Sequence, residues 1–197
     1  FAQAVEGGGN NLSLNLSGLT SLTSGVENIT DFSSTGDVSL AGNFITIGSQ
    51  TYGAKVSLAG DTSLSGTSAS LGGVEGNNNN LSLNFSNGSV AIDKGFSGIA
   101  NFVAETDVNL DGSFSTSGLQ TYKAGATLNS DTILSGTTAS FAQAVEGGGN
   151  NLSLNMSGLT SLTSGVENIA DFSSTGDVSL AGNFTTAGSQ TYGGNVS

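Results

Sequence analysis

The sequence predicts an all-β fold, a parallel β-solenoid (β-helix), and three observations support this prediction. Apolar and polar residues alternate in short runs, turn-forming residues separate these runs, and long stretches recur at a fixed spacing. Alternation with period two is typical of strands with one buried face. Many short strands in a recurring sequence are typical of a stacked array, whose units bury their apolar faces on one another. We therefore expect one continuous solenoid rather than separate globular domains.

The short runs give the expected strands and turns of one unit. Strands are expected at Leu12–Leu16, Val38–Leu40, Val56–Leu58 and Leu81–Phe85. Turns are expected at Gly7–Asn11, Ser17–Gly18, Ala41–Asn43, Gly60–Asp61 and Asn77–Asn80, which are rich in Gly and Asn. No stretch keeps a helical apolar period, and Leu19–Leu22 is too short to count as a helix.

The recurrence divides the chain into units of about 70 residues. Residues 141–197 copy residues 1–57, and a diverged copy lies between them, in which Gln120–Tyr122 matches Gln50–Tyr52. Six of the 57 aligned positions differ: Leu16/Met156, Thr30/Ala170, Ile45/Thr185, Ile47/Ala187, Ala54/Gly194 and Lys55/Asn195. The predicted units are residues 1–70, 71–140 (diverged) and 141–197 (incomplete). We expect the native array to continue past both ends of this fragment.

Strand and turn lengths predict on the order of 17 to 25 residues per coil, so one unit makes three or four coils. The chain has no Pro, which would delete a ladder hydrogen bond. Asp37, Asp107 and Asp177 recur once per unit, so in a stack of whole coils they would lie roughly 14 to 19 Å apart. Carboxylates at that spacing are screened from one another.

Composition excludes several classes of function. About half of the 197 residues are Gly, Ser, Thr or Asn, and three Lys oppose fifteen Asp and Glu, for a net charge of −12. Three Lys cannot make a basic surface for nucleic acid. Without Cys or His, the chain has no disulfide, no Cys/His zinc site and no His general base. No apolar run approaches the roughly 18 residues of a membrane span.

The phrase Gly48-Ser-Gln-Thr-Tyr-Gly-Ala-Lys-Val-Ser-Leu-Ala-Gly-Asp-Thr-Ser-Leu-Ser-Gly-Thr67 resembles the repeats of large bacterial exoproteins of the filamentous-haemagglutinin type. That family is exported by two-partner secretion or as autotransporters. The resemblance covers all three units, and it implies a right-handed parallel β-helix in an adhesin or stalk at the cell surface or outside the cell. It transfers no binding residue, because no binding motif of the family matches this repeat.

Two segments are candidates for ligand binding. Gly7–Asn15 loosely echoes a calcium-binding nonapeptide, but it offers only the neutral Asn10 and Asn11 where a carboxylate is needed, which favours a Gly/Asn corner. Gln-Thr-Tyr returns in every unit, so Tyr52, Tyr122 and Tyr192 form a candidate contact row for glycan or a neighbouring fibre. The alternative is a Tyr packed on a corner with its hydroxyl at the surface.

Catalysis and ice binding are less favoured by the sequence. The acids Glu6, Glu27, Asp31, Asp37 and Asp61 are spread along the repeat rather than paired as in a glycosidase. Thr20, Thr23 and Thr46 lack the regular Thr-x-Thr spacing of an ice-binding face.

We therefore expect a non-catalytic structural shaft that needs no cofactor and no metal. The alternatives are a self-assembling extracellular filament or matrix protein and, less favoured, a glycan-binding or ice-binding solenoid. Expected partners are further copies of the chain, or glycans or proteins of a host or neighbouring cell, at the cell surface or outside the cell.

Overall fold

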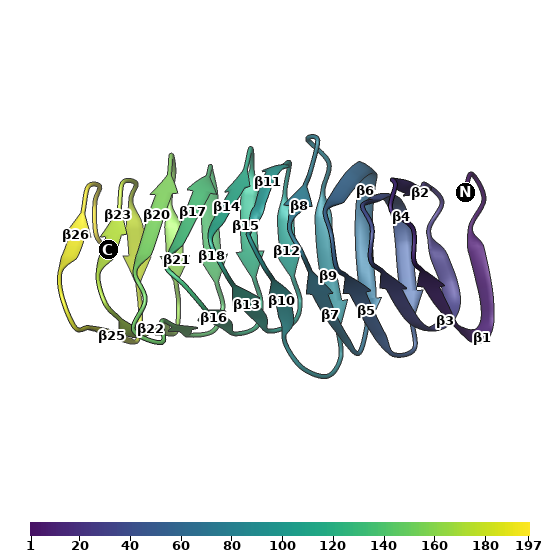
Figure 1. Cartoon of the computed structure of the whole chain (residues 1–197). Helices are drawn as coiled ribbons and strands as arrows, with labels where there is room; N and C mark the ends of the chain where they lie inside the picture. Colours follow the sequence, from purple (N-terminus) through teal and green to yellow (C-terminus); the bar gives the residue numbers. More distant parts are fainter.

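The computed structural model describes all residues, 1–197, and shows a parallel β-solenoid of about ten turns with no helix. Figure 1 shows the turns stacked side by side, with the N-terminus at one end and the C-terminus at the other. The predicted all-β parallel solenoid is confirmed. The chain forms no helix with the length and apolar character needed to cross a bilayer.

Each turn is a triangle of three strand segments, and four long strands continue around a corner. β1 (Val5–Leu14) and β3 (Val26–Ser34) each cover the first and second faces of the triangle, and β4 (Val38–Thr46) and β6 (Val56–Gly66) cover the third and first.

The remaining strands each lie on one face. Face 1 holds β9 (Leu81–Phe85), β12 (Phe102–Ala104), β15 (Leu119–Tyr122), β18 (Thr138–Phe141), β21 (Thr160–Leu162) and β24 (Val178–Leu180). Face 2 holds β5 (Ser49–Tyr52), β7 (Ser68–Leu71), β10 (Val90–Ile92), β13 (Val108–Leu110), β16 (Ala126–Leu128), β19 (Val145–Glu146), β22 (Gly165–Ile169) and β25 (Asn183–Thr186). Face 3 holds β2 (Thr20–Leu22), β8 (Val74–Glu75), β11 (Phe96–Ile99), β14 (Ser113–Thr116), β17 (Thr132–Gly136), β20 (Leu152–Met156), β23 (Phe172–Ser174) and β26 (Gln190–Tyr192).

The structural repeat is the turn, of about 19 residues, which lies within the expected coil length. On face 1, Leu64 pairs with Leu83, and Leu83 pairs with Ala104 one turn later. All pairings between strands are parallel. The structure therefore does not support a 70-residue structural unit: that period belongs to the sequence and does not make a whole number of turns.

Because the sequence period and the turn do not match, equivalent residues of successive units lie on different faces. Val38 begins a segment on face 3, whereas its counterpart Val108, eleven segments later, begins one on face 2. Eleven segments at three per turn make three and two-thirds turns. The expectation that Asp37, Asp107 and Asp177 stack in one column is therefore wrong, because they precede segments on faces 3, 2 and 1 in turn.

Apolar side chains fill the inside of the triangle in the alternating pattern that the sequence predicts. Val38 and Leu40 are buried, and Ser39 between them points outward. A single cluster of 41 buried residues runs through the solenoid. Because the cluster is continuous from turn to turn, each turn depends on its neighbours for its apolar burial.

The corners differ in part from the expected turns. The segments Gly7–Asn11, Ala41–Asn43 and Gly60–Asp61 lie inside the long strands β1, β4 and β6, where these bend around a corner. Leu19–Leu22, which is too short to predict a helix, contains strand β2 (Thr20–Leu22).

One corner glycine shows why these positions exclude side chains. Gly95 has a φ of 69°, and a Cβ there would collide with the backbone carbonyl of Ser113 in the next turn.

Truncating a core residue should cost much more stability than truncating an exposed one. Leu83 is fully buried on face 1, so Leu83→Ala should lower the free energy of unfolding by about 2 to 5 kcal/mol through lost burial and a cavity. Leu119→Ala is the control, because Leu119 is 50% exposed and its truncation should cost about 0.5 kcal/mol or less. Urea unfolding followed by circular dichroism measures both, and equal costs would contradict the stacked core.

Candidate functional site

The outer corners carry ladders of Asp and Asn side chains that connect successive turns. In the longest ladders, a side-chain oxygen of one turn accepts a hydrogen bond from the backbone N–H of the next turn. Asp131 accepts from the backbone N–H of Asn151 at 2.9 Å, Asn151 from Asp171 at 3.0 Å, and Asp171 from Ser189 at 2.6 Å. These bonds pair corner N–H groups that lie outside the strands.

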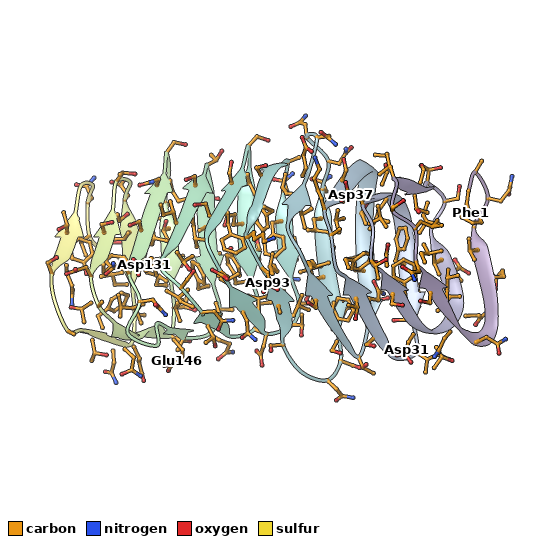
Figure 2. All side chains as sticks on the ribbon, in the orientation of Figure 1. Phe1, Asp31, Asp37, Asp93, Asp131 and Glu146 are labelled. Atoms are coloured by element: carbon orange, nitrogen blue, oxygen red, sulfur yellow. The ribbon has the colours of Figure 1, made fainter.

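There are three such ladders, two of which cross a unit boundary, and each stands on a different corner. Their members are Asn11, Asp31 and Ser49 between faces 1 and 2; Asp61, Asn80, Asn101 and Leu119 between faces 3 and 1; and Asp131, Asn151, Asp171 and Ser189 between faces 2 and 3. Figure 2 shows Asp31, Asp37 and Asp131 spread along the solenoid rather than gathered at one place.

Two of the ladder carboxylates, Asp61 and Asp171, are stabilised in their ionised form by the hydrogen bonds that they accept. Hydrogen bonds from the backbone N–H and side chain of Asn80 lower the pKa of Asp61. Hydrogen bonds from the backbone N–H and hydroxyl of Ser189 lower the pKa of Asp171. Both carboxylates therefore act as structural acceptors, and their lowered pKa favours the ionised form rather than a proton donor.

The repeated Tyr residues lie inside the solenoid. Tyr52 and Tyr122 are each 1% exposed, and each donates its hydroxyl hydrogen bond to the Oε1 of the Gln two residues earlier, at 2.9 Å and 2.8 Å. Tyr122 also stacks on Phe141 of the next turn, with ring centroids 4.5 Å apart. Burial raises the pKa of both hydroxyls well above the ordinary value.

Two of the three candidate contact residues are thus corrected. Tyr52 and Tyr122 cannot form a surface contact row, and their hydroxyls do not reach the surface as the alternative expected. Tyr192 lies in the last turn, half-buried, and bonds to Gln190 in the same way. The sequence signal was the i, i+2 spacing of Gln and Tyr, which places both on one side of a strand.

The buried Gln completes this arrangement. The Nε2 of Gln50 donates to the carbonyl of Phe44 at 2.9 Å and to that of Ser65, one turn further on, at 2.8 Å. Gln120 makes the same pair of bonds, to Phe114 and Ser135. Each Gln therefore joins two adjacent turns from the inside.

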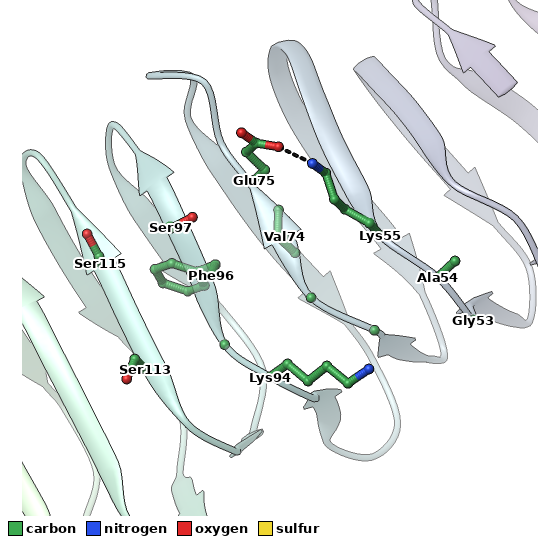
Figure 3. Close-up of a pocket in the computed structure, with 13 residues that line it drawn as sticks. Gly53, Ala54, Lys55, Val74, Glu75, Lys94, Phe96, Ser97, Ser113 and Ser115 are labelled. Atoms are coloured by element: carbon green, nitrogen blue, oxygen red, sulfur yellow. Dashed lines mark ion pairs between the residues drawn. The ribbon is translucent and has the colours of Figure 1, made fainter. Parts of the chain in front are cut away.

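The surface has one larger hollow, of about 780 Å³, on the outside of four successive turns (Figure 3). Its lining includes Lys55, Glu75, Lys94 and three serines, Ser97, Ser113 and Ser115. Lys55 forms an ion pair with Glu75, and the hydrogen bond and charge of Glu75 raise the pKa of the ammonium. The hollow thus offers hydroxyls and one unpaired ammonium, while its single carboxylate is already engaged.

The hollow is a product of sequence divergence. Gly72 and Gly73 occupy the corner that the third unit fills with Ala142, Gln143 and Ala144. Lys94 takes the place of Ser24 and Ser164, with a backbone φ of 68°. The hollow therefore does not recur in the described units.

The other candidate sites resolve as structural elements. In the segment resembling a calcium nonapeptide, Asn10 donates to the carbonyl of Gly7, and its counterparts Asn79 and Asn150 donate to those of Gly76 and Gly147, so the segment is a hydrogen-bonded corner. Nowhere do three acidic, His or Cys side chains gather as a metal site. Thr20 and Thr46 are buried, so they form no outward threonine array.

Comparison with protein-family models, with curated proteins and with solved structures found no match. The fold and the geometry of the corners, the buried Gln–Tyr pairs and the hollow therefore carry the functional argument.

Alkaline pH should destabilise the solenoid through Tyr52 and Tyr122. Their pKa is raised in the folded state, so their contribution to stability is complete below the unfolded pKa of about 10 and is lost as the pH rises above it. Urea unfolding midpoints from neutral to alkaline pH should show this loss. A double variant with Tyr52→Phe and Tyr122→Phe should be less stable at neutral pH but depend less on alkaline pH. Tyr192→Phe is the comparison: burial also raises the pKa of Tyr192, but this residue is only half-buried in the last turn, so its removal should change the alkaline dependence less. Tyrosinate absorbance that titrates with an ordinary pKa at all three sites would contradict the prediction.

A carboxylate in the middle of a corner ladder should destabilise the fold at neutral pH. Asn151→Asp places a third negative charge between Asp131 and Asp171, about 4.8 Å from each along the stack. Repulsion raises the pKa of the new carboxyl in the folded state, so the loss of stability should be present above pH ~4 and disappear below it.

Asn155→Asp is the matched control for the ladder variant. Asn155 is exposed on β20, the strand that begins directly after Asn151, and its register neighbour Ser135 carries no charge. Thermal unfolding across acid and neutral pH measures both variants, and equal loss in the two would show that the ladder position has no special role.

Proposed function

We propose that this chain is part of the structural shaft of a large secreted or cell-surface bacterial adhesin or extracellular fibre. The shaft is non-catalytic and is wound right-handed, as are nearly all parallel β-crossovers. The observation that carries the proposal is the uninterrupted stack of about ten turns around one apolar cluster. The repeat phrases that resemble filamentous-haemagglutinin-type exoproteins support the surface location.

The stack suits a mechanical role because hydrogen bonds between turns run along its whole axis. The chain forms 122 backbone–backbone hydrogen bonds, and the strand ladders run parallel to the axis of the solenoid. The buried Gln residues and the corner ladders add side-chain bonds between turns. In such an array, stability is approximately the sum of the turns and their interfaces, so length can increase without loss of order.

The rotation of the units favours a shaft over a flat binding surface. A surface that binds ice or a planar lattice must present the same residues on one face in successive units. Here equivalent residues move to another face with each unit, as Val38 and Val108 do. Repetition therefore extends the core but does not build a uniform face.

A single shaft and a multi-chain filament differ in mass per length. With 19.4 kDa in 197 residues and about 19 residues per turn of about 4.8 Å, one solenoid should carry about 0.4 kDa per Å. Scanning transmission electron microscopy of the native fibre should give this value. An integer multiple of it would overturn the single shaft and favour the self-assembling filament, in which the repeat surface is the interface between chains.

A further inference from the structure

The sequence period is not a whole number of turns, so successive units of the array begin on different faces of the solenoid. Each unit contains eleven strand segments, and each turn contains three. Because three does not divide eleven, every unit is turned by a third of a revolution relative to the one before. Three units, or 33 segments, make eleven whole turns and restore the starting direction.

The three faces accept the same sequence without loss of its contacts. Gln50 and Tyr52 on face 2 make the bonds that Gln120 and Tyr122 make on face 1. Asn28 on face 1 and its counterpart on face 2 have the same backbone φ of 53° and donate to the equivalent Glu.

The corner ladders show the same equivalence at all three corners. The backbone N–H of Ser49 reaches Asp31 at 2.8 Å, that of Leu119 reaches Asn101 at 2.9 Å, and that of Ser189 reaches Asp171 at 2.6 Å. The contacts that a unit makes therefore do not depend on the face on which the unit begins.

We infer that the number of units sets the direction in which the distal part of the shaft faces, as well as its length. This inference rests on the proposed shaft function. Gain or loss of one unit changes the length by three and two-thirds turns, about 18 Å, and rotates everything beyond it by 120°. Partners that recognise one repeated surface would be carried on three sides of the shaft in succession.

A deletion of one unit tests the inference. Removal of residues 58–127 joins Ser57 to Leu128 and restores the Val-Ser-Leu sequence that residues 56–58 have in the intact chain. Spin labels at Ser39 and Thr175 lie on the same column of face 3, seven turns or about 34 Å apart in the intact chain. The deletion should reduce their axial separation to about 16 Å but move them to different faces.

The matched control deletes residues 58–115, which is three whole turns of the face 3 column. Its labels remain on one face, about 19 Å apart along the axis. Double electron–electron resonance should therefore give a longer distance for the one-unit deletion than for the control, although its axial separation is shorter. A distance no longer than that of the control would overturn the inference.

Small-angle scattering separates failure of the inference from failure of the shaft. Both deletions should shorten the rod, by about 18 Å and about 14 Å. Shortening without the longer label distance overturns the rotation and leaves the shaft. If the one-unit deletion alone does not fold, the faces are not equivalent and the inference is also overturned. If neither shortens the rod, the shaft proposal itself is wrong.

If both deletions fail to fold, the rotation between units can be measured on the intact chain. Ser57 and its counterpart Thr127 are separated by three and two-thirds turns on different faces, whereas Ser57 and Ser135 are separated by four turns on face 3. The distance between labels should be longer for the first pair. Equal distances would contradict the rotation.

Discussion

The structure depends on the parallel hydrogen-bond ladder between successive turns, because it places each residue about 4.8 Å from the residue one turn earlier. Each residue must therefore fit the residues stacked directly above and below it, one turn away. The absence of Pro follows, since a missing N–H would interrupt the ladder. The conformation of Gly95 follows as well, since the next turn leaves no space for a side chain. Gln50 is tolerated in the interior because its amide bonds to carbonyls of two turns.

The same constraint governs charge. Like charges in one column lie close enough to repel, so the ladder at the corner between faces 2 and 3 places neutral Asn151 between Asp131 and Asp171. Asn serves this role because its oxygen accepts from the next turn while its amide donates to the previous one. Glu6 and Glu27 depart from the pattern, since they pair in register, and the amide of Asn28 donates to Glu6. The charge of −12 is thus distributed along columns rather than gathered into a site.

Much of the fold could be predicted from alternation alone, as in Val38-Ser-Leu40, because the ladder imposes period two on every strand. The length of a coil also followed from strand and turn lengths. What could not be predicted was the face of each residue. A period of 70 residues suggested whole coils, but strand segments are added one at a time, and a unit of eleven fits the stack as well as a unit of twelve. The position of Tyr52 was missed because parity shows which residues share a side, not which side is inward.

When the solenoid is extended by strand segments, its core continues unchanged, but its surface turns to another side. Every added segment finds the same kind of neighbour below it, so the core and the corner bonds continue through units that begin on any face, as the two copies of residues 1–57 do. The surface does not continue in this way, because it turns with each unit. Selection for an unbroken core alone therefore accepts a unit of any number of segments, whereas selection for one uniform face requires a multiple of three. A unit of eleven segments is compatible with the first and not with the second, and this is the physical reason why we propose a mechanical role for the repeat.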